Sequence, residues 1–198
     1  MTMRLPVALL GALSLAAALP AAAKASPGFA TPAGAFKAGE EICARSFEGL
    51  KASKPFGSEL KAATGFESAT ADMAAPGVAS LTPGLEHLEI VKAQLPEPGP
   101  AAVYVLSGAR AGGLPSCQVV AVRALGAAAE AKTWFEDPAS GWTDKVPATR
   151  DAALNLVERT FGRPFQGQIG VGATLNYVDG EPKGAITALS SFSLARDR

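Results

Sequence analysis

Residues 115–123, with the sequence PSCQVVAVR, are the stretch on which the predicted fold depends. A run of valine and alanine between a proline and an arginine is typical of a strand inside a sheet. The same stretch contains Cys117, one of two cysteines in the chain. The other is Cys43, so a bond between the two would join this strand to the N-terminal part of the chain.

Residues 36–50 have the spacing of an amphipathic helix. Their apolar side chains recur seven, four and three positions apart, at Phe36, Cys43, Phe47 and Leu50. This periodicity puts Cys43 on the inward face, within reach of a strand. The chain lacks a C-x-x-C pair, the spacing of thiol redox proteins. We therefore expect a structural disulfide between Cys43 and Cys117, with two buried thiols or a redox-active pair as the alternatives.

The N-terminus has the layout of a secretory signal peptide. A short basic start precedes an apolar run over residues 5–19, and residues 23–25 (AKA) offer a small-residue cleavage site. An uncleaved membrane anchor is the alternative, and Pro6 and Pro20 argue against it because they interrupt the apolar run. We therefore expect export to the periplasm or the exterior, where cysteines oxidise.

Three segments follow from this layout. We expect residues 1–25 to be removed as the signal peptide, residues 26–35 to be a flexible linker, and residues 36–198 to form one domain. The 16 basic and 18 acidic residues of the mature chain give a net charge of −2. This balance gives no reason to expect a nucleic-acid partner or an anionic membrane surface. No second apolar run is long enough to span a membrane, so we expect a soluble mature protein.

Helical patterns and β-prone runs share the rest of the chain. Helices are predicted over residues 58–63, 124–135 and 150–161, from helical spacing of apolar residues or from a capping serine or threonine. Strands are predicted over residues 66–70, 87–95, 101–106, 115–123, 166–178 and 184–194. Residues 136–149 are expected to be a loop. The order predicts an α+β fold: a mostly antiparallel sheet of about five or six strands, with helices packed on one face and one disulfide.

The best candidate for a binding site is residues 134–142, WFEDPASGW. This stretch holds both tryptophans of the chain, Trp134 and Trp142, and two adjacent carboxylates, Glu136 and Asp137. Aromatic rings beside carboxylates can stack on a sugar or grip a peptide, and a pair of carboxylates can do acid–base chemistry. The residues themselves favour a structural role, in which Trp134 and Phe135 complete the hydrophobic core and Trp142 covers its edge.

Other catalytic patterns are incomplete. His87 is the single histidine, which excludes most zinc sites and leaves one possible base for a serine triad. Ser58 and Lys61 have the Ser-x-x-Lys spacing of serine acyl-transfer enzymes, but the supporting Lys-Thr-Gly element is missing and Ser58 is explained as a helix N-cap. The glycines at 167, 170 and 172 lie inside a predicted strand, which is the wrong place for a nucleotide loop. We assign no catalytic residue, metal or cofactor.

These observations favour an exported, non-catalytic binding or accessory module of the cell envelope. Its partner would be a small molecule, a glycan or an envelope protein. The alternative is a cell-envelope hydrolase that uses the carboxylates near residues 134–142. A thiol redox protein is a third class, and it would need free cysteines.

Overall fold

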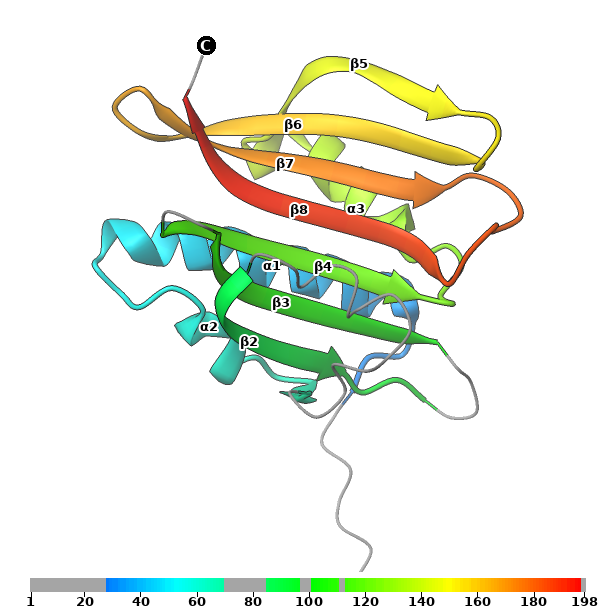
Figure 1. Cartoon of the computed structure of the whole chain (residues 1–198), viewed down its shortest axis with the longest axis horizontal. Helices are drawn as coiled ribbons and strands as arrows, with labels where there is room; N and C mark the ends of the chain where they lie inside the picture. Colours follow the sequence, from blue (N-terminus) through cyan, green and yellow to red (C-terminus); the bar gives the residue numbers. More distant parts are fainter. Residues whose placement is uncertain (1–27, 70–84, 97–100, 111–112, 197–198) are drawn as a thin grey trace, which may run out of the picture.

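The computed structural model describes residues 28–69, 85–96, 101–110 and 113–196 (Figure 1). The predicted signal peptide over residues 1–25 lies outside the described residues. Among the described residues, no helix combines the length and the apolar character needed to cross a membrane.

A single antiparallel sheet dominates the described part of the chain. Its eight strands are β1 (Phe66–Ser68), β2 (Leu85–Ala93), β3 (Ala102–Arg110), β4 (Leu114–Val122), β5 (Thr143–Asp151), β6 (Leu156–Gln166), β7 (Ile169–Val178) and β8 (Ile186–Arg196). Their order in the sheet is β1-β2-β3-β4-β8-β7-β6-β5. Two four-stranded meanders therefore meet at the antiparallel pair of β4 and β8, near the middle of the sheet.

A helix precedes each meander. The helices are α1 (Pro32–Lys51), the short α2 (Ser58–Lys61) and α3 (Ala128–Glu136), and a 3-10 turn, η2 (Pro138–Ser140), follows α3. The Thr31 side chain caps α1 by accepting a hydrogen bond from the Gly34 N–H at 3.1 Å. In Figure 1, α1 lies behind β3 and β4, and it packs against both strands and against α3.

The predicted α+β fold, with five or six strands and helices on one face, is wrong. The described residues form eight strands, and α2 and α3 are short, so the chain is rich in sheet. The largest error concerns residues 150–161, for which the apolar spacing predicts a helix. They contain the end of β5, a turn and the first half of β6.

The reason lies in the turn between β5 and β6. The Asp151 carboxylate accepts hydrogen bonds from the N–H groups of Ala153 and Leu154, and Asn155 has a positive φ of 52°. This is the local bonding by which Asp and Asn favour turns over helices. The prediction of a loop over residues 136–149 is also wrong, because most of β5 lies there. All nine residues of β5 are exposed, so the alternation that marks a strand is missing.

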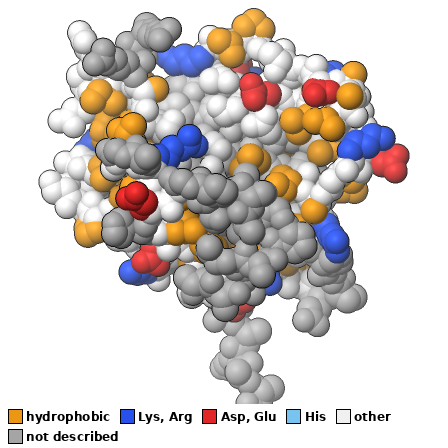
Figure 2. Space-filling model, viewed as in Figure 1, with side chains coloured by type: hydrophobic (Ala, Val, Ile, Leu, Met, Phe, Trp, Pro, Cys, Tyr) orange, Lys and Arg blue, Asp and Glu red, His pale blue; other side chains and the backbone are white. Residues whose placement is uncertain are grey.

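The centre of the sheet is buried on both faces. Towards α1, the core includes Cys117, Val119 and Ala121 of β4. On the opposite face, a smaller cluster includes Leu106 of β3 and Val120 of β4. This burial explains the continuous apolar run in β4. Figure 2 views this second face, where the visible side chains include hydrophobic groups and charges of both signs.

Two contacts hold α1 close to β4. The predicted disulfide is confirmed: Cys43 of α1 bonds to Cys117 of β4, and their Cα atoms lie 5.5 Å apart. One turn earlier, Gly39 faces the sheet so closely that a Cβ atom there would lie 2.8 Å from Val119 and 2.9 Å from Val105. A larger residue at position 39 would therefore push the helix away from the sheet.

Replacing Gly39 by alanine should destabilise the protein. The added methyl group has no room, and overpacking of this kind costs roughly 1–3 kcal/mol. The matched control is Gly49→Ala in the same helix, where a Cβ would make an ordinary contact 3.6 Å from Lys54. That change should instead stabilise the helix by about 0.5–1 kcal/mol. Urea unfolding of both variants measures the difference, and equal stabilities would contradict the close approach.

Removing the disulfide should also lower the free energy of unfolding. The bond joins residues 74 positions apart, and closing a loop of that length is worth about 4 kcal/mol on the chain-entropy model. The double variant Cys43→Ser/Cys117→Ser should lose about this amount in urea unfolding. Thiol titration of the denatured, unreduced wild-type protein should find no free thiol, and two free thiols would contradict the bond.

Candidate functional site

A groove along α3 brings together three of the four predicted binding residues. Its cavity has a volume of about 730 Å³. The lining residues are Lys37 of α1 together with Ala129, Glu130, Thr133, Trp134, Glu136 and Asp137 at and after α3. We call this surface the Trp134 groove.

The two tryptophans have different environments. Trp142 is only 4% exposed and packs against Phe135 and Phe192, with ring centroids 5.2 and 5.9 Å away. Arg163 of β6 lies over its ring at 4.9 Å. Trp134 is half-buried and meets Trp142 edge-on at 6.1 Å. The structure therefore places Trp134 at the groove and Trp142 in the core beneath it.

The end of α3 fixes the position of Asp137. This residue follows the last residue of the helix, and its Oδ1 accepts a hydrogen bond of 2.9 Å from the Ala139 N–H. Pro138 then begins η2, and Gly141, with a φ of 72°, ends it. The sequence Asp-Pro signals such a turn because proline fixes φ and aspartate caps the following N–H groups. The Asp137 carboxylate is consequently held at the surface beside Glu136.

A second groove lies between α3 and the strands β5, β6 and β7. Its volume is about 600 Å³, and we call it the strand groove. Its lining includes the charged residues Lys132, Glu136, Asp144, Lys145, Arg150 and Arg159, together with Val146, Pro147, Ala148, Thr149, Val157 and Tyr177. Glu136 thus borders both grooves, one on each side of α3.

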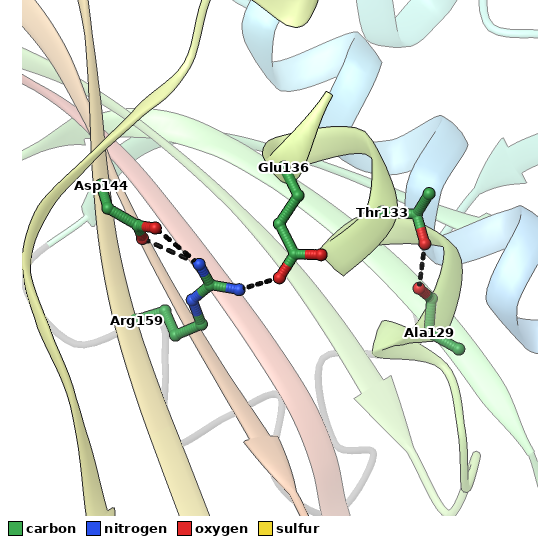
Figure 3. A network of polar contacts seen from close by, with 5 residues as sticks. All are labelled: Ala129, Thr133, Glu136, Asp144 and Arg159. Carbon is green, nitrogen blue, oxygen red and sulfur yellow. Dashed lines mark hydrogen bonds and ion pairs between the residues drawn. The ribbon is translucent and has the colours of Figure 1, made fainter. Parts of the chain in front are cut away.

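An ion-pair network centred on Arg159 joins β6 to α3 and β5 (Figure 3). Its guanidinium group pairs with Glu136 on one side and donates two hydrogen bonds to Asp144, of 2.7 and 3.0 Å, on the other. The same group lies over the Phe161 ring at 4.8 Å, and the Arg159 side chain is 15% exposed. Burial lowers the pKa of Arg159, but the two carboxylates outweigh that effect and hold it above its ordinary value.

Sequence reasoning missed Arg159 and Asp144. Asp144 lies in the segment predicted to be a loop, and Arg159 lies in the segment predicted to be a helix. Neither side chain could therefore be placed opposite Glu136 from the sequence. The alternation of Val157, Arg159 and Phe161 along one face of β6 was the available signal.

A buried carboxylic acid lies outside both grooves. Glu40 of α1 is fully buried, and Ser190 of β8 donates a hydrogen bond to its Oε1. Its Oε2 has no hydrogen-bond partner among the described residues. Burial raises its pKa to about 8; the Ser190 hydrogen bond acts in the opposite direction and the charge of Glu41 adds slightly to the rise. No sequence pattern signals this burial, because glutamate in a helix is usually exposed.

The remaining candidates have structural positions. Ser58 begins α2, whose N-cap is Gly57 and not Ser58 as predicted, and Lys61 pairs with Glu89 at 3.0 Å. The side chain of His87 lies outside the described residues. No group of three or more His, Cys, Asp or Glu side chains that could hold a metal ion occurs in the part of the chain that the structure describes.

No protein-family model matches the chain, and the searches of curated proteins and of solved structures gave no match. Its function is therefore inferred from the chemistry of its own residues.

Glu40 should make stability fall as the pH rises. The unfolded chain releases this proton near the ordinary glutamate value of 4.5, whereas burial raises the pKa in the folded chain to about 8. Between these values the folded state binds more protons, so the free energy of unfolding should decrease by up to about 1.4 kcal/mol per pH unit from this group. The variant Glu40→Gln has no carboxyl group at this position, so its free energy of unfolding should not show this decrease with pH.

Urea unfolding between pH 5 and pH 8 measures this effect. The stability of Glu40→Gln relative to the wild type should increase steadily across the series. The control is Glu158→Gln on β6, which replaces an exposed carboxylate and should keep the wild-type slope. Parallel curves for Glu40→Gln and the wild type would show that Glu40 ionises normally.

Proposed function

We propose that the mature chain is an exported binding module of the cell envelope, which holds its ligand in the Trp134 groove and catalyses no reaction. The observation that carries this proposal is the convergence of Trp134, Glu136 and Asp137 on one cavity of about 730 Å³. Pockets for small ligands span roughly 300–1,000 Å³ and combine apolar walls with a few polar groups. A half-buried indole with carboxylates beside it meets that description.

Two features support export. The N-terminal residues have the composition of a signal peptide. The Cys43–Cys117 disulfide fits an oxidising compartment, where such bonds persist. The structure does not describe residues 1–27, so export is part of the proposal.

The alternative, a hydrolase, needs a carboxylic acid that can give up a proton and a second carboxylate that acts as a base or nucleophile. Glu136 and Asp144 are both bound to Arg159, whose guanidinium group occupies one oxygen of Glu136 and both oxygens of Asp144. Asp137 is engaged by a backbone N–H. These contacts support a binding role more than acid–base catalysis.

Trp134 provides the test. The mature protein is titrated with short peptides, saccharides and small organic ions, and binding is followed by tryptophan fluorescence and calorimetry. A ligand of the groove should change the fluorescence of the wild type and of Trp142→Phe, but not that of Trp134→Phe. Trp134→Ala should weaken binding by about five- to thirtyfold, because one stacked ring contributes about 1–2 kcal/mol.

The control is a thermal unfolding scan, in which Trp134→Ala should remain folded because this ring is only half-buried. Binding that is unaffected by Trp134→Ala would contradict the proposal. Turnover of a saccharide or peptide that is lost in Glu136→Gln would replace it with the hydrolase.

A further inference from the structure

The charges around the Trp134 groove are unbalanced. Three carboxylates and one ammonium group line it. The Glu136 carboxylate is paired with Arg159, and the Lys37 ammonium is paired with Glu41 at 3.1 Å. With the other described residues, Glu130 and Asp137 form no ion pair. Two negative charges at the groove are therefore left without a cation among these residues.

The end of α3 adds to this imbalance. A helix carries partial negative charge at its C-terminal end, where cationic residues are favoured and acidic residues are unfavourable. α3 has no basic residue in its last turn and instead ends with Glu136, which pairs with Arg159, followed by Asp137, which has no ion pair among the described residues. Acidic residues at this end work against the stability of the helix itself, and such a departure from a local rule is expected at functional sites. A cation bound at this end of α3 would offset the unfavourable interaction between these carboxylates and the helix dipole.

The aromatic wall suits the same ligand. A cation over an indole ring is attracted by the negative face of the ring, and tryptophan is the best of the aromatic side chains in this respect. The aliphatic stem of an arginine or lysine could lie against Ala129 and Trp134 while its charged end reaches the carboxylates.

We infer that the Trp134 groove binds an arginine or lysine side chain from an exposed basic segment of a partner protein. The guanidinium or ammonium group lies against Trp134 and is neutralised by Glu130 and Asp137. This inference rests on the proposed binding function and specifies the ligand of that site.

The probe is a capped peptide of alternating glycine and arginine, compared with the same peptide in which citrulline replaces arginine. Citrulline keeps the shape of the side chain and removes its charge. Calorimetry with the full mature chain at low salt should show the arginine peptide binding at least tenfold more tightly than the citrulline peptide. Raising the salt to about 500 mM should reduce this preference, because screening weakens exposed charge pairs.

The variant Glu130→Gln/Asp137→Asn tests the two carboxylates. Asparagine can still accept the hydrogen bond from Ala139, and Glu130 is exposed, so the variant should fold. It should bind the arginine peptide about tenfold more weakly than the wild type and leave weak binding of the citrulline peptide unchanged. The matched control, Glu158→Gln on β6, should behave like the wild type.

The outcomes separate this inference from the proposed function. Equal binding of the two peptides, no binding of either, or full affinity in the double variant would overturn the inference. A saccharide that binds at Trp134 while the arginine peptide does not would overturn it too, and would leave the binding function standing. If no peptide, saccharide or small ion alters Trp134 fluorescence, the proposed function fails as well.

Discussion

The contact between α1 and β4 is the constraint on which the rest of the structure depends. A disulfide fixes Cys43 to Cys117, and Gly39 lets the helix lie directly on Val105 and Val119. Because β4 pairs with β3 on one side and with β8 on the other, this contact positions α1 over the junction of the two meanders. α3 packs on α1, and residues of both helices line the Trp134 groove. The contact between α1 and β4 therefore also fixes where the groove lies.

The second meander is tied to α1 by polar groups. Arg163 of β6 donates a hydrogen bond of 3.1 Å to the Ala44 carbonyl, pairs with Glu48 at 2.9 Å and stacks on Trp142. Trp142 in turn contacts the Trp134 ring edge-on, with the ring centroids 6.1 Å apart. The two tryptophans therefore have separate roles: Trp142 is a core residue that packs against Trp134, and Trp134 lines the groove.

Glu136 links the two sides of α3. It lines both grooves, and its ion pair with Arg159 continues to Asp144 on β5. A partner cation near Glu136 would compete with Arg159 for the same carboxylate, so the charges of the two grooves are coupled through one residue. The acidic end of α3 is unfavourable for the helix alone, and contacts elsewhere in the chain offset it: Glu136 pairs with Arg159, and Asp137 caps η2 through the Ala139 N–H.

The sequence by itself determined the amphipathic face of α1 from Phe36 onward, the pairing of Cys43 with Cys117 and the position of the buried strand β4. Each depends on local spacing or on the presence of just two cysteines. The sequence did not determine where α1 begins, because residues 32–35, predicted to be linker, form its first turn. Only the tertiary structure decided the course of β5 and β6. An exposed edge strand has no apolar alternation, and the apolar spacing of residues 150–161 fitted a helix equally well. It also decided the Arg159 network and the part of the groove that Lys37 lines. Asp144 and Arg159 meet only when β5 pairs with β6, and Lys37 joins residues 129–137 only when α1 packs on α3.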